Sequence, residues 1–287
     1  MRFDTLISSE QLTALLADDS ADVLVCDCSF DLTAPAAGFA SYHEAHVPGA
    51  IYLHLETELS GPKTGQNGRH PLPSQDAFAD AMSRAGASDG TQIVCYDSTG
   101  GMYAARLWWL ARWAGHRDVA VLDGGLPGWR AAGNPVESGD TATRAPGGFT
   151  VREPLVETVD FDSVRANIDD GSRVVLDARA PDRFRGENET LDAVGGHIPK
   201  ARNRFFRDNL DASGRFKPAD VLRQEIGEIA GTTDGAALIG QCGSGVTACH
   251  NLLAMEIAGI RGAALYPGSW SEWSSRNGAP VATGAQA

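Results

Sequence analysis

The sequence predicts an α/β fold of two related domains, each built on a mainly parallel sheet flanked by helices. Two observations predict it. The chain carries the same ordered series of short motifs twice, and within each half short apolar runs alternate with longer helical patterns. The length of 287 residues, with 43% apolar side chains, is enough for two hydrophobic cores of ordinary size.

The internal repeat is carried by motifs in matching order. Residues 45–50 return as residues 196–201 with their His and Pro in place, and the apolar run that ends at Asp27 returns before Asp177. Two further pairs follow, residues 122–129 with 266–273 and residues 133–136 with 278–281. Four ordered matches are hard to obtain by chance, so we expect both halves to share one fold.

Apolar runs and helical patterns alternate in both halves. The predicted buried strands are residues 93–96, 119–122 and 236–239, and the predicted helices lie within residues 101–115 and 246–258. Gly259 stands where a helix C-cap would lie. Strand, helix and strand at this spacing predict right-handed βαβ units and hence parallel sheets.

The Gly-, Thr- and Pro-rich stretch near residues 141–155 is typical of a linker. We therefore predict an N-terminal domain over residues 1–140, a linker over 141–155 and a C-terminal domain over 156–287. The His residues of the two matching motifs, His46 and His197, occur in both halves, which favours a role in a shared turn over a role in catalysis.

Composition limits the classes of partner. The net charge of −13 disfavours nucleic acid and anionic membrane surfaces, so an anionic substrate would need a local basic patch. No stretch is long and apolar enough to span a membrane, and the N-terminus lacks the pattern of a secretory signal, which predicts a cytoplasmic enzyme. The five cysteines are odd in number and form no Cys-x-x-Cys pair, so we expect neither a disulfide framework nor a metal.

One of these cysteines stands in a distinctive place. Cys242 follows a predicted buried strand, and a glycine-bearing turn with Gly243 and Gly245 leads from it into a helix. Backbone N–H groups and the helix dipole are expected to converge on the sulfur there. We expect them to lower the pKa of the thiol by about two from its usual value of about 8.5, which makes it mostly thiolate at pH 7.

The repeat shows that only one half can carry thiol chemistry. Aligning residues 93–97 with residues 238–242 places Asp97 where Cys242 stands in the second half. An aspartate cannot carry sulfane sulfur, so the sequence predicts that the first domain lacks the catalytic group.

These segments resemble a known family. The loop from Cys242 to Ala248, the Gly-His-Ile-Pro segment at 196–199 and residues 268–273 are similar to tandem-domain rhodanese enzymes, in particular those of the 3-mercaptopyruvate sulfurtransferase type. The resemblance covers nearly the whole chain and implies two rhodanese-like domains. It also implies sulfur transfer from 3-mercaptopyruvate to a thiol or cyanide through a Cys242 persulfide, with no metal and no organic cofactor.

The resemblance further implies a relay for proton transfer. Ser244 matches the serine of the family's cysteine loop, His70 matches its histidine, and Glu56 stands where the family has an aspartate. Such a relay would help to protonate pyruvate as it leaves.

Substrate binding is also implied by the resemblance. Arg183 matches a family arginine that grips the donor carboxylate, and its planar guanidinium suits that role. A second family arginine has no counterpart, because this sequence is shorter there and offers only Thr190, Leu191 or Asp192, so Arg185 is the proposed substitute. The loop residues expected to line the substrate site are Gly243, Gly245, Val246 and Thr247.

Three other functions remain open. A thiosulfate sulfurtransferase is one, although the thiosulfate enzymes of the family usually carry basic residues directly after the cysteine, where Gly243 and Ser244 stand here. A cysteine phosphatase needs an arginine at the position of Ala248 and is disfavoured. A non-catalytic binding module is the third. For the enzyme, the expected acceptor is a small thiol, cyanide or a protein such as thioredoxin.

Overall fold

The computed structural model describes residues 2–285, which form two compact units. Unit 1 comprises residues 2–61, 73–155 and 211–216, and unit 2 comprises residues 62–72, 156–210 and 217–285. The units differ from the predicted domains in three segments. Residues 62–72 belong to unit 2, residues 211–216 belong to unit 1, and the predicted linker packs within unit 1, where Gly147 N–H donates to Ser83 O at 2.8 Å.

Each unit holds a five-stranded parallel sheet, as the repeat predicts. The strands of unit 1 are β1 (Leu6–Ile7), β2 (Val23–Asp27), β3 (Ile51–Tyr52), β4 (Gln92–Tyr96) and β5 (Val119–Leu122). Those of unit 2 are β6 (Glu157–Thr158), β7 (Val174–Asp177), β8 (Arg202–Asn203), β9 (Leu238–Gln241) and β10 (Ala264–Leu265). The spatial order β1-β5-β4-β2-β3 recurs as β6-β10-β9-β7-β8, so the two sheets share one topology.

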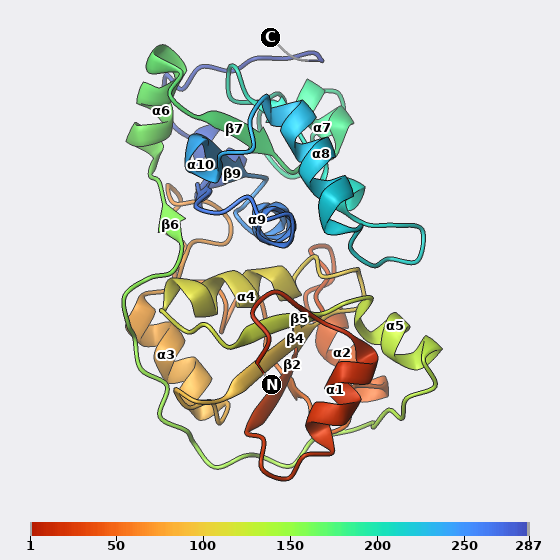
Figure 1. Cartoon of the computed structure of the whole chain (residues 1–287). Helices are drawn as coiled ribbons and strands as arrows, with labels where there is room; N and C mark the ends of the chain where they lie inside the picture. Colours follow the sequence, from red (N-terminus) through yellow and green to blue (C-terminus); the bar gives the residue numbers. More distant parts are fainter. Residues whose placement is uncertain (1, 286–287) are drawn as a thin grey trace. The chain divides into compact units, whose positions relative to one another are not determined.

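Helices cover both faces of each sheet, which is what a parallel sheet requires. The helices of unit 1 are α1 (Ser9–Leu16), α2 (Ala37–Glu44), α3 (Gln75–Arg84), α4 (Ala104–Trp113) and α5 (Gly125–Ala131). Those of unit 2 are α6 (Phe161–Asp170), α7 (Pro181–Arg185), α8 (Ala219–Ala230), α9 (Thr247–Ile257) and α10 (Ser269–Trp273), with 3₁₀ turns at η1 (Phe206–Asn209) and η2 (Gly235–Ala237). In unit 1, α3 and α4 lie on one side of the sheet and α1, α2 and α5 on the other (Figure 1).

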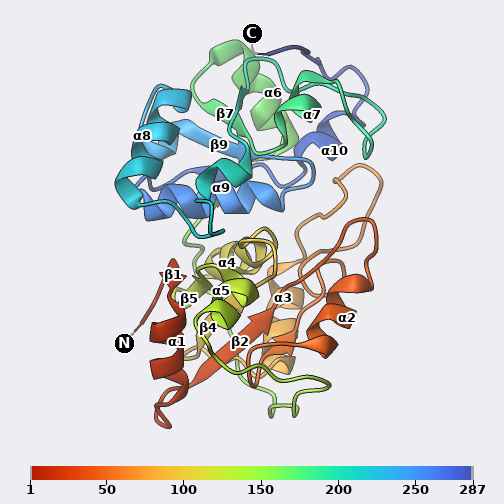
Figure 2. The same cartoon turned by 90° about the vertical axis from the view of Figure 1, so that its right-hand side faces the viewer.

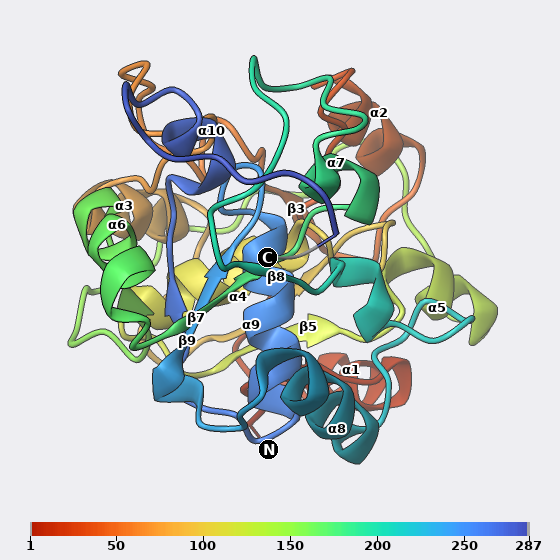
Figure 3. The ribbon, with the colours of Figure 1, turned by 90° about the horizontal axis from the view of Figure 1, so that it is seen from above.

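The central strand of each sheet is buried on both faces, so its sequence is a continuous apolar run rather than an alternating one. All five residues of β4 and all four of β9 are buried. In unit 2, α8 and α9 pack together on one side of β7 and β9, and α6 lies on the other side (Figures 2 and 3). The helix that follows the cysteine is therefore held against the sheet from which the cysteine emerges.

The predicted elements around the site are confirmed except at one strand. The predicted helices are observed as α4 and α9, and the strands at 93–96 and 119–122 as β4 and β5. The strand predicted at 236–239 was wrong at its start, because residues 236 and 237 lie in η2. The carboxylate of Asp234 accepts from Ala236 N–H at 3.1 Å, and this local cap favours a turn over an extended chain there.

The repeated His-containing motifs define a turn in each unit, as expected. His46 Nδ1 lies 2.8 Å from Tyr42 O, and His197 Nδ1 lies 2.9 Å from Phe184 O. The His46 imidazole stacks on the Tyr42 ring with centroids 4.2 Å apart, and the His197 imidazole stacks on the Phe184 ring with centroids 3.8 Å apart. Both histidines therefore stabilise the local structure of their units through a hydrogen bond and ring stacking.

Candidate active site

Cys242 is the first residue after β9, the central strand of its sheet, and the loop that follows leads into α9. In parallel sheets, ligands bind beyond the carboxyl ends of the strands, so this is the end where a reactive group is useful. The thiol is only 2% exposed, and the N–H of Ser244 points at the sulfur with an N–Sγ distance of 3.5 Å.

The cysteine loop is fixed by the start of α10. Cys242 N–H donates to Ser269 Oγ at 3.1 Å, and Cys242 O accepts from Trp270 N–H at 2.9 Å. Gly243 O accepts from Ser271 N–H at 2.9 Å. Ser269 adopts a left-handed backbone with φ of 53°, which is strained for a residue other than glycine. A strained backbone of this kind persists only where surrounding contacts hold it in place. In this conformation the Ser269 hydroxyl accepts the hydrogen bond from the cysteine loop.

Two glycines let the loop take its course. Gly245 has a φ of 76°, and a Cβ on it would lie 2.5 Å from the carbonyl oxygen of Pro267. A Cβ on Gly243 would lie 2.9 Å from Arg69 Nη2 and 3.7 Å from both terminal nitrogens of Arg183. The absence of a side chain at Gly243 therefore leaves room for two guanidinium groups directly over the loop.

Unit 1 contains a loop that corresponds to the cysteine loop of unit 2. Asp97 follows β4 as Cys242 follows β9, in agreement with the sequence alignment. Its carboxylate accepts four backbone N–H groups, from Thr99 at 2.7 Å, Gly101 at 3.0 Å, Tyr103 at 2.7 Å and Ala104 at 2.9 Å. In unit 1 the loop after the central strand is thus an anion cradle, which its own aspartate fills.

Ser244 and His70 lie together in unit 2. His70 Nδ1 is 2.8 Å from Ser244 Oγ, and both side chains are buried, with exposed fractions of 2% and 6%. His70 belongs to the segment 62–72, where Arg69 N–H donates to Ser271 Oγ at 3.0 Å. Glu56 belongs to unit 1, where its N–H donates to His54 Nδ1 at 3.1 Å, and its place in a relay stays a prediction.

Arg183, on α7, lies beside the cysteine loop but is held by carboxylates. Its Nη2 is 2.8 Å from Glu189 Oε1 and its Nε is 3.1 Å from Glu189 Oε2. Arg185 points elsewhere and makes a two-pronged ion pair with exposed Glu187, at 2.8 Å and 2.7 Å. The geometry therefore separates the two predicted arginines, and Arg183 is the one next to Gly243.

The sequence alone did not single out Arg69 or Arg179 as site residues. Arg69 pairs with Asp192 and reaches over Gly243. Arg179 donates to Asp177 at 2.7 Å, and its guanidinium lies 4.6 Å from the ring centroid of Trp270. Burial alone would lower the pKa of Arg179, but Asp177 and Glu189 outweigh burial and raise it. Cys242 adds a smaller contribution in the same direction. The position of Arg69 next to His70 was the available signal.

Val246 and Thr247 lie where the loop becomes α9. Val246 precedes the helix and is buried, and Thr247 is its first residue and is half-buried. Their contact with a substrate stays a prediction.

The other cysteines are packed in the cores. Burial raises the pKa of the Cys26, Cys28 and Cys95 thiols well above the usual value, so these groups stay protonated. Cys249 is fully buried in α9, with Sγ 3.3 Å from Gly245 O. Each of the five cysteines is a free thiol.

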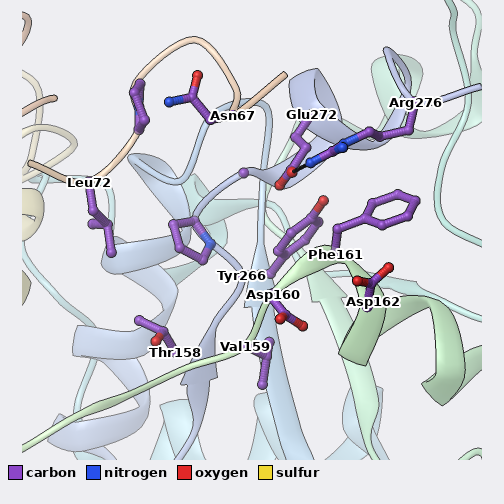
Figure 4. Close-up of a pocket in the computed structure, with 13 residues that line it drawn as sticks. Asn67, Leu72, Thr158, Val159, Asp160, Phe161, Asp162, Tyr266, Glu272 and Arg276 are labelled. Atoms are coloured by element: carbon purple, nitrogen blue, oxygen red, sulfur yellow. Dashed lines mark hydrogen bonds and ion pairs between the residues drawn. The ribbon is translucent and has the colours of Figure 1, made fainter. Parts of the chain in front are cut away.

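A cavity of about 470 Å³ borders the site without including the thiol. Its walls include Pro71 and Leu72, which follow His70, and the ion pair of Glu272 and Arg276 at 2.7 Å (Figure 4). Neither Cys242 nor Ser244 is among the described residues that line this cavity.

Neither a metal-binding cluster nor a membrane-spanning helix is found in the part of the chain that the structure describes. Within residues 2–285, no group of three or more His, Cys, Asp or Glu side chains is arranged to hold a metal ion. None of the described helices has the length and apolarity needed to cross a membrane.

Comparisons with known proteins find sulfurtransferases among the relatives of this chain. The chain is 43% identical over 281 residues to a probable 3-mercaptopyruvate sulfurtransferase of Pseudomonas aeruginosa, covering 97% of this chain and 98% of the relative. It is 36% identical over 284 residues to a putative thiosulfate sulfurtransferase, SseB, of Mycobacterium tuberculosis, covering 99% and 98%.

Solved structures show the same architecture. The crystal structure of SseA from Escherichia coli, described as a 3-mercaptopyruvate sulfotransferase, matches with a TM-score of 0.80 at 27% identity, over 93% of this chain and 99% of that one. Tum1 from Saccharomyces cerevisiae, at 23% identity, shares the fold with a TM-score of 0.87 over the whole of both chains. The rhodanese-like domain family matches twice, at residues 8–132 and 160–276, and the chain therefore belongs to the rhodanese family as a tandem-domain member.

Proposed function

We propose that this protein is a sulfurtransferase that moves sulfane sulfur from 3-mercaptopyruvate to a thiol or cyanide through a persulfide on Cys242. The observation that carries the proposal is the Ser244–His70 pair, 2.8 Å apart, in the loop that begins at Cys242. A persulfide needs only the thiol, whereas a hydroxyl paired with an imidazole is useful when the leaving group must gain a proton. The name of the P. aeruginosa relative supports this choice of donor.

In the first half-reaction, the Cys242 thiolate attacks the sulfur of 3-mercaptopyruvate. An S–S bond forms, the C–S bond breaks, and its electron pair leaves with carbon as the enolate of pyruvate. The loop amides and the start of α9 would stabilise the negative charge on the sulfur before and after transfer. The Asp97 carboxylate, held by four amides in the matching loop, supports this role.

The enolate must take up one proton to become pyruvate. Ser244 is placed to donate it, and His70 Nδ1 can return a proton to the serine oxygen. Glu56 would complete the relay by orienting His70, as the family resemblance implies.

In the second half-reaction, an acceptor thiolate or cyanide attacks the outer sulfur of the persulfide. The S–S bond breaks, the sulfur leaves with the acceptor, and Cys242 returns to the thiolate. We propose thioredoxin or a small thiol as the acceptor and the cytoplasm as the location. The five free thiols suit a compartment that keeps thiols reduced.

Thiosulfate is the second candidate donor, and one observation favours it. Arg69, from segment 62–72, brings a guanidinium over Gly243, a basic group of the kind that is missing directly after Cys242. The M. tuberculosis relative carries the thiosulfate name.

Steady-state turnover of the two donors with cyanide as acceptor tests the proposal. We expect kcat/KM for 3-mercaptopyruvate to exceed that for thiosulfate by at least about tenfold, or about 1.4 kcal/mol of transition-state stabilisation. A preference for thiosulfate would transfer the assignment to the second candidate, and turnover of neither donor would favour a binding module.

A further inference from the structure

We propose that Asp192 is an internal counter-ion that occupies the arginine site of the donor carboxylate and must be displaced when the donor binds. The inference rests on the proposed function, since it concerns the same site. It makes Asp192 a specificity-determining residue in the short segment where the second arginine of the family has no counterpart.

The geometry places Asp192 between two guanidinium groups. Its Oδ1 is ion-paired with Arg69 Nη1, and its Oδ2 lies 3.5 Å from Arg183 Nη2. Both arginines approach the position of a Cβ on Gly243, at 2.9 Å and 3.7 Å. A carboxylate held by these two arginines next to the cysteine loop is what a carboxylate donor would offer, so Asp192 and the donor compete for the same charges.

The local charges balance without a donor. Three arginines, Arg69, Arg179 and Arg183, face three carboxylates, Asp177, Glu189 and Asp192. In a chain with a net charge of −13, an anionic donor would therefore meet no net positive charge at this site. One carboxylate has to yield before the donor carboxylate can be paired.

Asp192 is the carboxylate best suited to yield. Asp177 is fully buried and bound to Arg179 at 2.7 Å and 3.1 Å, and Glu189 grips Arg183 through both oxygens. Asp192 reaches Arg183 only at 3.5 Å, so its one close ion pair is with Arg69. Burial, with a smaller contribution from Glu189, raises the pKa of Asp192 in spite of its arginine neighbours, so its negative charge is less well stabilised here than in water.

The backbone around Asp192 also allows the exchange. The residue lies outside helices and strands, between α7 and the His197 turn. Its N–H is anchored to Glu189 Oε1 at 3.1 Å, and Val194 O accepts from Trp270 Nε1 at 2.9 Å. The loop is thus tied at points other than the Asp192 side chain, which can turn away while the backbone keeps its place.

The test is the variant Asp192→Asn in the full chain. We expect KM for 3-mercaptopyruvate to fall about tenfold with kcat within about twofold of wild type, because Arg69 loses its carboxylate partner and Arg183 keeps only Glu189. The matched control is Glu187→Gln, which removes a carboxylate of the same loop that pairs with Arg185 instead. It should leave KM unchanged, and Asp192→Glu, which keeps the charge, should keep the high KM.

Calorimetric titration with pyruvate separates this inference from the proposed donor, because pyruvate carries the carboxylate but no sulfur. Tighter pyruvate binding by Asp192→Asn than by wild type supports the inference even if 3-mercaptopyruvate is not turned over. An unchanged or raised KM together with unchanged or weaker pyruvate binding would overturn it, since Asp192 would then only orient the arginines. Asp192→Ser serves as a second neutral variant should the asparagine protein fail to fold.

Discussion

Asp97 and Cys242 occupy the same position in two copies of one loop, each as the first residue after the central strand of its sheet. The Asp97 carboxylate is held by four backbone N–H groups at 2.7–3.0 Å. Unit 1 has thus kept the anion-binding property of the loop while losing the group that can carry sulfur. The Asp97 loop of unit 1 is therefore an internal comparison for the Cys242 loop of unit 2.

Replacing Asp97 by Ala should destabilise unit 1 without removing sulfur transfer. Four amides, three of them in buried hydrogen bonds, would lose their acceptor, and we expect the free energy of unfolding to fall by about 3 kcal/mol. Urea denaturation followed by tryptophan fluorescence measures the loss. The folded fraction of the variant should still form a Cys242 persulfide, and an unchanged stability would mean that the cradle contributes nothing to unit 1.

Ser244→Ala should distinguish the donors. The hydroxyl is needed to protonate the departing enolate of pyruvate, whereas sulfite leaves thiosulfate as a stable anion. We expect kcat for 3-mercaptopyruvate to fall about a hundredfold and kcat for thiosulfate to fall less than about threefold. Ser213→Ala, in a turn of unit 1, is the control. Equal losses with both donors would remove the Ser244–His70 pair from the mechanism.

The two predicted arginines should behave differently. Arg183 lies beside Gly243, so Arg183→Ala should raise KM for 3-mercaptopyruvate at least about tenfold through loss of a charge-assisted hydrogen bond. Arg185 pairs with exposed Glu187, and Arg185→Ala should change KM by less than about twofold. Initial-rate kinetics on both variants decide between them, and the reverse order would assign the carboxylate to Arg185.

The free energy of unfolding should depend on pH through the ionisation of Glu189. Burial alone would raise its pKa, but hydrogen bonds from Arg183 and from backbone amides outweigh burial and lower it from 4.5. The unfolded chain therefore binds more protons than the folded one at acid pH. The stabilisation is complete above about pH 4.5 and is lost as the pH falls through the lower, folded value.

Glu189→Gln should accordingly be less stable than wild type by about 3 kcal/mol at pH 7, with the difference shrinking below pH 4.5. Denaturant titrations at several pH values measure it. A difference that stays constant down to pH 3 would show that the charge of Glu189 is not what stabilises this loop.

Much of the fold followed from the repeat. The matching motifs around His46 and His197 and the apolar runs that became β4, β5 and β9 predict two parallel sheets with one topology, because side-chain burial there depends on local pattern. Residues 236 and 237 were misassigned, since a single side-chain cap from Asp234 outweighs apolar character.

The site was only partly readable from the sequence. Cys242 and Asp97 follow from the strand–turn–helix pattern, whereas His70 could be named only through the family resemblance, because it lies 174 positions from Ser244. The ion pair between Arg69 and Asp192 could not be predicted from the sequence. Their meeting depends on segment 62–72 packing within unit 2, which no local pattern encodes.

The most direct test of the account is the intact mass of the protein after incubation with 3-mercaptopyruvate and removal of excess donor. We predict a gain of one sulfur atom, about 32 Da, that disappears on adding a thiol acceptor and is missing in Cys242→Ser. Cys249→Ser, which alters a packed cysteine in α9, should still gain the mass. No gain in wild type, or an equal gain in Cys242→Ser, would contradict the assignment of the sulfur to Cys242.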